Sequence, residues 1–203
     1  HVSLLFILMS YQTPKNNFYL RWQGKQTRIG ITGGIASGKT SVSNFIGQIK
    51  DWPTMDADIY AREALIPGSK ISEKVLSRYG EQITNTDQII NRKLLANIIF
   101  ENTHERSWLE NVIHPFIRKR FNEELDKYKS EPKLILIIPL LFEKNYNDLC
   151  SEIWYVDCSK ETQIERLIKR DGLTLNQAIQ RIDSQFTSSF KKQFSDFILN
   201  NDG

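Results

Sequence analysis

Short apolar runs alternate with longer amphipathic stretches along the whole chain. Runs that favour β-strands occur at 28–32, about 53–56, 133–138, 152–157 and 195–200. LILII, within the third of these runs, is apolar without interruption, which is typical of a strand that is buried on both faces. Strands that alternate with helices predict a parallel sheet with helices on both sides.

Apolar residues at helical spacing fill the segments between these runs. Val42, Phe45, Ile46 and Ile49 form one stripe at i, i+3, i+4 and i+7, which predicts a helix directly after the first strand. The stretch from about 58 to 130 is too long for one crossover helix and contains several stripes. They are Ile71, Val75 and Tyr79; Leu94, Leu95, Ile98 and Ile99; and Trp108, Leu109, Val112 and Ile113. Asn102 and Glu105 resemble a capping box before the last stripe, and we expect Pro115 to end or kink that helix.

A helical hairpin is predicted between the last two strands. Ser159 can cap its first helix, Asp171-Gly172 interrupts it, and Thr174 with Gln177 forms a capping box for the second. The hairpin carries Arg166, Arg170 and Arg181.

The stretch ITGGIASGKTS, residues 31–41, contains a phosphate-binding loop pattern. Gly33 to Thr40 fit G-x-x-x-x-G-K-[ST], and the pattern lies between a predicted strand and a predicted helix, as it requires. Glycines let successive N–H groups face phosphate oxygens, and the following helix N-terminus favours negative charge. Lys39 would reach the β- and γ-phosphates of a nucleotide, and the Thr40 hydroxyl would bind Mg²⁺.

Composition restricts the class of protein further. The chain has 203 residues and a net charge of +3, a bias too weak to indicate nucleic-acid binding. Its two cysteines, Cys150 and Cys158, form no C-x-x-C pair, and three histidines form no metal-binding cluster with them. We therefore expect a reduced, cytoplasmic protein. The apolar run at 2–9 is too short to span a bilayer, so no membrane association is expected.

Three classes of phosphate-loop protein compete for this sequence. The D-x-x-G and N-K-x-D motifs of GTPase switches and the LSGGQ motif of transport ATPases do not occur in it. A small-molecule kinase needs a helical region that binds the acceptor and a lid that carries arginines, and the chain has candidates for both. A nucleoside or nucleotide kinase and a non-catalytic ATP-binding module remain the alternatives.

From about Arg28 to Gly203, the sequence resembles the dephospho-coenzyme A kinase family. The resemblance rests on RIGITGGIASGKTS, MDADIYARE, INRKLLANIIF, IHPFIRKR, IPLLFE, VDCSKETQIERLIKRDG, RIDSQ and SDFILNNDG, in the order of the family. It implies transfer of the ATP γ-phosphate to the ribose 3′-hydroxyl of dephospho-CoA. Mg²⁺ is expected with ATP, and no obligate protein partner is evident in the sequence. The resemblance also implies a P-loop kinase-like α/β fold: a five-stranded parallel sheet with flanking helices, a helical acceptor-binding insertion and a helical lid. We expect the core at 28–57, 131–160 and 193–203, the insertion at 58–130 and the lid at 161–192.

The resemblance, together with the patterns above, assigns candidate roles to individual residues. ATP would be bound by the loop residues Gly33, Gly34, Ile35, Ala36, Ser37, Gly38, Lys39, Thr40 and Ser41, and by Asn200 and Asn201 after the last strand. Asp56 and Asp58 follow a predicted strand, at the edge of a sheet where ligands bind. By resemblance Asp58 is the base, and Asp56 contributes to the acceptor site or caps a helix.

The remaining candidates come from the insertion, the lid and the third strand. Arg62, Arg92 and His114 are candidates for acceptor binding, although His114 could equally be a histidine satisfied by backbone at the Pro115 kink. Arg170 is the first choice among the lid arginines to close onto ATP. Glu143 ends the run LILIIPLLFE and could act through water on Mg²⁺, or could be a loop charge.

Two features depart from the family or stand outside the resemblance. The family commonly has an arginine six residues after Gln185, where this chain has Lys191, which cannot make the bidentate contacts of a guanidinium. Residues 1–27 precede the first strand and contain no motif. We expect them to be a loose extension, so that a chain starting near Gln26 would fold and turn over normally.

Overall fold

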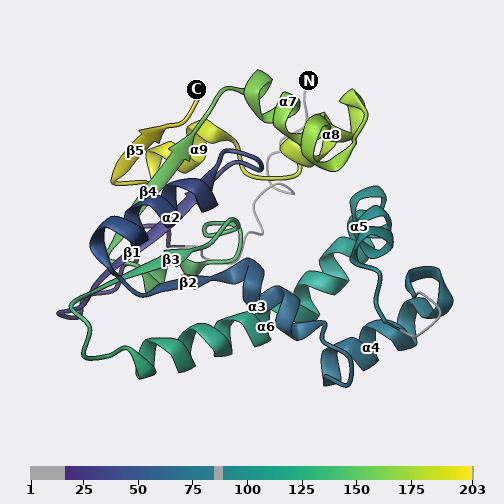
Figure 1. Cartoon of the computed structure of the whole chain (residues 1–203), viewed down its shortest axis with the longest axis horizontal. Coiled ribbons are helices and arrows are strands. Elements are labelled where there is room, and N and C mark those ends of the chain that lie inside the picture. The colour runs from purple at the N-terminus through teal and green to yellow at the C-terminus, as the bar shows by residue number, and fades with distance from the viewer. Residues whose placement is uncertain (1–16, 85–88, 203) are drawn as a thin grey trace, which may run out of the picture.

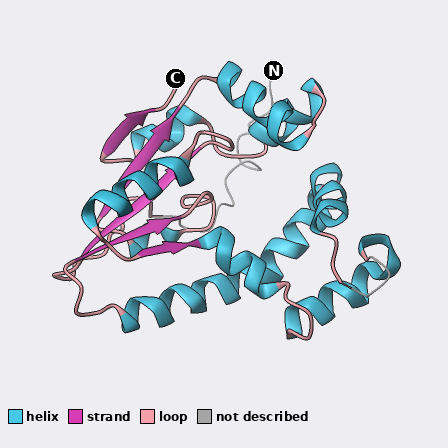
Figure 2. Ribbon diagram, in the orientation of Figure 1, coloured by secondary structure: helices cyan, strands magenta, loops and turns pink. Residues whose placement is uncertain are grey.

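The computed structural model describes residues 17–84 and 89–202. Its centre is one five-stranded sheet in which every paired strand is parallel, in the order β2-β3-β1-β4-β5 (Figure 1, Figure 2). The strands are β1 (Thr27–Gly33), β2 (Thr54–Asp56), β3 (Lys133–Ile137), β4 (Glu152–Asp157) and β5 (Phe197–Asn200). The predicted parallel α/β fold is confirmed, and each predicted strand is present, although β5 begins two residues later than expected.

Helix α2 (Lys39–Lys50) covers one face of the sheet through a narrower stripe than predicted (Figure 1). Val42 and Ile46 pack against the buried residues of β1 and β3 on that face. Phe45 and Ile49 are exposed, at 65% and 59%. The prediction of a four-residue stripe is thus wrong for these two, because α2 meets the sheet along only one i, i+4 row.

The opposite face of the sheet supports the larger core, to which β2, β3 and the helices between them contribute. Those elements are α3 (Ala57–Ala64), α4 (Lys70–Tyr79), the 3₁₀ turn η1 (Gly80–Ile83), α5 (Arg92–Glu101) and α6 (Thr103–Lys127). Helices therefore occupy the predicted insertion, and α3 and α6 pack side by side there.

Helix α6 continues through Pro115, so of the two predicted outcomes, an end or a kink of the helix, the end is wrong. Buried side chains recur every fourth residue on both sides of it, at Leu109, Ile113, Ile117, Phe121 and Leu125. A proline inside a helix removes one hydrogen bond and costs about 3 kcal/mol. Burial of five large side chains along one face outweighs that cost, which the local pattern around Pro115 cannot reveal.

Most predicted helix caps are present. Ser159 caps α7 (Lys160–Asp171) as predicted, and Asn91, which was not predicted as a cap, caps α5. Thr174 and Gln177 form the complete predicted capping box at the start of α8 (Leu175–Asp183). Asn102 caps α6 as half of the predicted box, because the Glu105 side chain turns away to accept hydrogen bonds from Arg78 and Tyr79.

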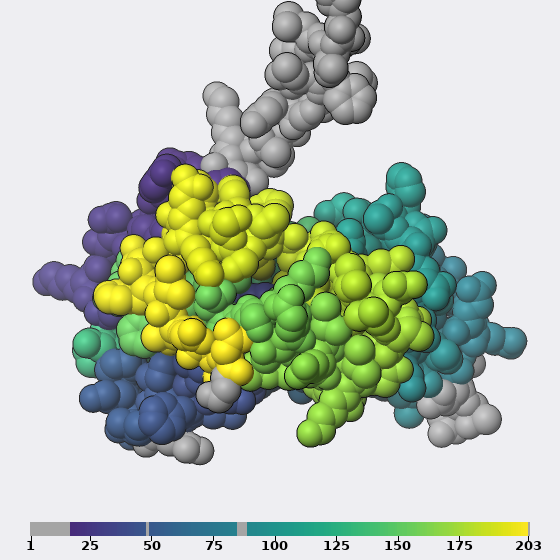
Figure 3. All heavy atoms as spheres, turned by 90° about the horizontal axis from the view of Figure 1, so that it is seen from above, coloured from purple at the N-terminus to yellow at the C-terminus, as the bar shows by residue number. Residues whose placement is uncertain are grey.

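The predicted helical hairpin is present as α7 and α8, is called the lid below, and is followed by α9 (Ser188–Gln193). Gly172 ends α7 with φ at 66°, the left-handed conformation that glycine adopts easily. Seen from above, the atoms of the hairpin lie against the teal segment that contains α5 (Figure 3). Arg181 of α8 lies over the ring of Phe100 in α5, with 4.1 Å from its guanidinium carbon to the ring centroid.

Residues 17–26 are packed against the domain, contrary to the expected loose extension. Trp22 donates its backbone N–H to the carbonyl of Cys150. The guanidinium carbon of Arg28 lies 3.6 Å from the centroid of the Trp22 ring. Phe18 packs against the larger core. Asn147, in the 3₁₀ turn η2 (Tyr146–Leu149), donates to the backbone carbonyls of Asn17 and Leu20. The rest of the predicted extension, residues 1–16, lies outside the described residues.

Among the described residues, no helix has both the length and the apolar character that crossing a bilayer requires.

Candidate active site

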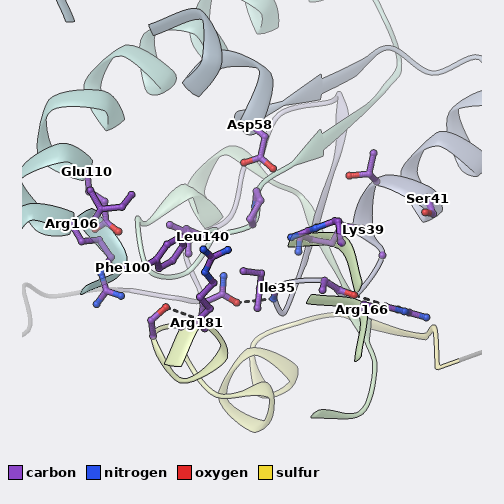
Figure 4. A pocket seen from close by; sticks show the side chains of 18 of the residues that line it. Ile35, Lys39, Ser41, Asp58, Phe100, Arg106, Glu110, Leu140, Arg166 and Arg181 are labelled. Atoms are coloured by element: carbon purple, nitrogen blue, oxygen red, sulfur yellow. Dashed lines mark hydrogen bonds between the residues drawn. The ribbon is translucent and has the colours of Figure 1, made fainter. Parts of the chain in front are cut away.

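A cavity of about 1070 Å³ opens at the carboxyl edge of the sheet, between the phosphate-binding loop, the lid and helices α5 and α6 (Figure 4). Parallel sheets bind ligands at this edge, because the loops after the strands meet there. The cavity is lined by Ile35, Ala36, Gly38, Lys39, Thr40, Ser41, Asp58, Ile99, Phe100, Arg106, Leu109, Glu110, Pro139, Leu140, Arg166, Lys169, Arg170, Arg181, Ser184, Gln185 and Asn201.

The phosphate-binding loop connects β1 to α2 through two residues in the left-handed region, of which only one is a glycine. Ala36 and Gly38 both have positive φ, at 58° and 88°. A Cβ atom on Gly34 would lie 2.1 Å from Gln163 Nε2, and one on Gly38 would lie 2.1 Å from Asn201 Nδ2. These two glycines therefore let polar side chains approach the loop closely.

Three amide side chains from distant parts of the chain hold the loop. Gln163 of α7 donates to the carbonyl of Ile35 at 2.7 Å, and Gln185, after α8, accepts from the N–H of Ile35 at 2.9 Å. Asn201, after β5, donates to the carbonyl of Ser37 at 2.8 Å. The loop is thus fixed from the lid and from the last strand together.

Lys39 starts α2 and is almost fully buried. Its ammonium donates to the carbonyls of Gly33 and Gly34, at 3.2 and 2.8 Å. Burial, and next the nearby positive charge of Lys191, lowers the pKa of Lys39 to about 8. An anionic ligand in the cavity would favour the charged form of Lys39 again.

Of the other loop residues, some line the cavity and some do not. Thr40 and Ser41 line the cavity and are exposed. Gly33, Gly34 and Ser37 do not line it. Ser37 is buried, and its hydroxyl has no hydrogen-bond partner among the described residues.

The two candidate carboxylates lie in different places. Asp56 ends β2 and caps α3, because its Oδ1 accepts from the N–H of Asp58 at 2.8 Å. Burial raises the pKa of Asp56, and that hydrogen bond opposes the rise. Asp58, in the first turn of α3, is exposed and lines the cavity (Figure 4). Asp58, and not Asp56, is therefore positioned to meet a ligand.

Besides Lys39, five cationic side chains line the cavity: Arg106, Arg166, Lys169, Arg170 and Arg181. The Asp171 carboxylate binds two of these cations at once, accepting from Arg170 at 2.8 and 3.0 Å and from Arg181 at 3.2 Å. Arg166 donates to the carbonyl of Asn201 at 2.9 Å. These groups make the lid side of the cavity attractive to phosphate oxygens.

The predicted acceptor-site arginines lie elsewhere. Arg62, at the end of α3, and Arg92, at the start of α5, are both exposed and do not line the cavity. His114 lines a smaller, mostly apolar pocket of about 160 Å³ that shares Asp58 and Glu110 with the large cavity. Burial, and next the charge of Lys144, lowers the pKa of His114 to about 4, so its ring is neutral at physiological pH.

Glu143 and Asn200 are also outside the cavity wall. Glu143 accepts from the N–H of Phe186 at 3.0 Å and forms an ion pair with Lys191 at 2.8 Å. Asn200 accepts from the N–H of Asp202 at 3.0 Å. Glu143 therefore binds the segment after the lid, and its arrangement gives no support to the expected metal role.

Oxygen ligands for Mg²⁺ are present at one end of the cavity. The Thr40 hydroxyl and the Asp58 carboxylate both line it. Among the described residues, no group of three or more His, Cys, Asp or Glu could hold a metal ion. This donor set fits Mg²⁺, which takes few protein ligands and fills its remaining positions with water and substrate phosphates.

Sequence reasoning missed several residues of the site. Arg106 and Glu110 lie one turn apart on α6, and no motif marks them as polar cavity residues. Gln163 and Gln185 are part of stretches quoted above, but their positions gave no sign that both would bond to Ile35. Contacts across more than a hundred residues leave no local pattern.

A nucleotide-binding loop after β1, a carboxylate after β2 and a lid rich in arginine define the class of protein: a P-loop small-molecule kinase. The comparisons specify the family. The sequence model of the family described as dephospho-CoA kinase matches residues 27–203, and the chain belongs to that family.

Relatives and solved structures agree with this family. A dephospho-CoA kinase of Prochlorococcus marinus (strain NATL2A) is 58% identical over 194 residues, which cover 94% of this chain and 91% of the relative. One from Synechocystis sp. (strain ATCC 27184 / PCC 6803 / Kazusa) is 44% identical, covering 88% and 89%. The structure of a dephospho-CoA kinase from Campylobacter jejuni is 30% identical with a TM-score of 0.61, covering 87% and 88%. A Thermus thermophilus crystal structure is 28% identical with a TM-score of 0.74, covering 89% and 91%.

Proposed function

We propose that the large cavity carries out the reaction of the family, the ATP-dependent phosphorylation of the ribose 3′-hydroxyl of dephospho-CoA to coenzyme A. One observation carries the proposal. Lys39 and Thr40 of the phosphate-binding loop, Asp58 and the lid arginines all line one continuous cavity. A phosphoryl donor, its acceptor and a base could therefore meet there.

The loop and the lid cations bind the phosphates of ATP in this proposal. Backbone N–H groups at the start of α2 and the charge of Lys39 favour the β- and γ-phosphates. Arg170 and Arg166 contribute charge from the lid, and Asn201 holds the loop through Ser37. Phosphoryl transfer depends mainly on positioning and on stabilising developing negative charge, which these groups provide.

Asp58 orients the acceptor hydroxyl and accepts its proton. This role is supported by its exposure to the cavity, and by the engagement of Asp56 in capping α3. Mg²⁺ would be held by Thr40, with Asp58 nearby, and would neutralise charge on the transferring phosphates.

The acceptor is bound by the opposite wall. Arg106 lies on α6, and Arg181 is the lid arginine that contacts Phe100 of α5; we assign these two lining cations to the diphosphate of dephospho-CoA. His114 borders the site through the small apolar pocket. Arg62 and Arg92, which lie outside both pockets, remain candidates only for an arrangement in which their helices move.

A cytoplasmic location without an obligate protein partner completes the proposal. Cys150 and Cys158 are buried and unpaired, as expected for a protein of a reducing compartment.

A coupled ADP-release assay with a panel of acceptors tests the function. We expect turnover with dephospho-CoA and at most slow turnover with nucleosides and nucleoside monophosphates. Preference for a nucleotide acceptor would support the nucleotide-kinase alternative, and ATP binding without turnover would support a non-catalytic module.

Asp58→Asn and Asp56→Asn form a matched pair that tests the assignment of the base. Both keep size and hydrogen bonding, and asparagine caps helices as well as aspartate does. We expect Asp58→Asn to lose about 10²- to 10⁴-fold in kcat while ATP affinity, measured by calorimetry, is kept. Asp56→Asn should retain most of kcat. The opposite result would exchange the two roles.

A further inference from the structure

The N-terminal strap, defined here as residues 17–26, contacts the segment by which the chain leaves the lid. That segment, residues 184–194, is called the lid exit below. The Phe18 ring packs against three rings of the lid exit, Phe186, Phe190 and Phe194, with centroid distances of 6.4, 5.2 and 5.3 Å. Arg21 adds a hydrogen bond of 2.7 Å to the carbonyl of Phe194.

The strap also contacts the segment between β3 and β4. Asn147 donates to the carbonyls of Asn17 and Leu20 at 3.0 and 2.9 Å. Trp22 is bonded to the carbonyl of Cys150, just before β4. Phe18 also packs against Phe142, in the loop after β3, at 6.0 Å. Phe18 thus connects the lid exit to a fixed part of the domain.

The lid exit is also attached to that loop directly, through the Phe190 and Phe194 rings against Phe142 and through an ion pair. Lys191 is wholly buried, and its ammonium lies 2.8 Å from the Glu143 carboxylate, which also accepts from the N–H of Phe186. Lys191 therefore holds α9 in place, and it does not line the large cavity. Glu143 and Phe142 are neighbours in the chain, so Phe18 and the Lys191–Glu143 ion pair both attach the lid exit to the loop after β3.

Gln185 connects this stretch to the active site. It precedes Phe186, it lines the large cavity, and its Oε1 accepts from the N–H of Ile35 in the phosphate-binding loop at 2.9 Å. A shift of the Phe186 backbone would move Gln185 with it. Misplacement of a site group by about 1 Å can cost on the order of 10²-fold in rate.

We propose that Phe18 is a positioning residue of the active site: it fixes the lid exit and thereby keeps Gln185 on the phosphate-binding loop. The strap therefore contributes to ATP use, and not only to the stability of the fold. The proposal rests on the role of the loop in binding ATP given above.

The test is a double-mutant cycle with Phe18→Ala, Gln185→Ala and the double variant. ATP affinity is read by calorimetry, and kcat and KM are measured at a temperature where every variant is folded. We expect Phe18→Ala to lower kcat/KM for ATP by about five- to tenfold, as does Gln185→Ala, with KM for dephospho-CoA within about twofold. The double variant should lose no more than Gln185→Ala alone, because both changes remove one interaction.

Two variants separate positioning from stability. Phe18→Leu keeps an apolar side chain in the aromatic cluster and should recover most of the activity; it also serves if Phe18→Ala does not fold. Leu20→Ala is the matched control, since Leu20 lies in the same strap with its side chain 53% exposed. Two shortened chains repeat the comparison of strap present with strap absent. The chain that begins at Asn17 keeps Phe18 and should bind ATP normally, whereas the chain that begins at Gln26 lacks Phe18 and should lose ATP affinity.

Two results would overturn the proposal. One is a Phe18→Ala variant with a lower melting temperature but normal ATP affinity and kcat/KM. The other is full additivity of the losses in the double variant, which would show that Phe18 does not act through Gln185. Because ATP affinity is measured without an acceptor, the outcome does not depend on whether dephospho-CoA is the acceptor.

Discussion

The donor side and the acceptor side of the cavity differ in how the chain builds them. On the donor side, six of the seven residues in the stretch Ile35–Ser41 line the cavity, and Asn201 binds the same loop. On the acceptor side, lining residues come from α3, α5, α6 and α8. The donor side is therefore a local structure that distant side chains hold in place, whereas the acceptor side exists only after several helices have packed.

On both sides, some of the predicted residues line the cavity and others do not; on the donor side Gly33, Gly34, Ser37 and Asn200 do not. Lys39, Thr40 and Asn201, predicted for the donor side, line the cavity. Three acceptor residues were predicted besides Asp56. His114 borders the small pocket, whereas Arg62 and Arg92 line neither pocket. The following predictions test whether substitutions on the two sides also differ in the size of their effects on catalysis and stability.

The largest effect is expected on the donor side, for Lys39→Ala. This change removes a buried charge that would stabilise the transferring phosphoryl group, so kcat should fall by about 10²-fold or more. Steady-state kinetics with dephospho-CoA and circular dichroism measure activity and fold together. Lys50→Ala, at the exposed end of the same helix, is the control and should be unaffected. Near-normal turnover by the Lys39 variant would contradict the role of the loop.

An intermediate effect is expected on the acceptor side, for Arg181→Ala. This change removes the contact with Phe100 and the ion pair with Asp171, and with them a cation of the cavity wall. KM for dephospho-CoA should rise about tenfold, the size expected for one charge-assisted hydrogen bond. Arg62→Ala should change the same KM by less than about twofold. A larger loss for Arg62 than for Arg181 would mean that α3 supplies the acceptor contacts.

The smallest effect is expected from His114, and it concerns stability. Its pKa is lowered to about 4 in the folded chain, against about 6.5 when unfolded, so the unfolded chain binds more protons between these values. The free energy of unfolding should therefore rise as pH increases from about 4 to 6.5. The groups that set the pKa are Lys144, which lowers it together with burial, and Glu110, which opposes them.

Urea denaturation across that pH range measures this effect. In His114→Gln the pH-dependent contribution should be absent, while His104→Gln, at an exposed position in the first turn of α6, keeps it. Equal pH slopes for the parent chain and His114→Gln would show that the histidine is not held neutral by its surroundings.

The sequence alone determined those features whose causes lie within a few residues. The phosphate-binding loop, the five strands and the caps at Ser159 and Thr174 all follow from short-range geometry: glycine torsions, apolar runs and side chains that bond to nearby N–H groups.

Only the tertiary structure decided the rest, because burial and long-range contacts set it. Packing along α6 outweighs the interruption by Pro115, and the sheet leaves Phe45 exposed. The segment before β1 carries no motif, yet Phe18 is packed among aromatic rings from four other positions. Which of two nearby carboxylates faces the cavity depended on the turn from β2 into α3, which uses Asp56 as the cap and leaves Asp58 free to meet a ligand.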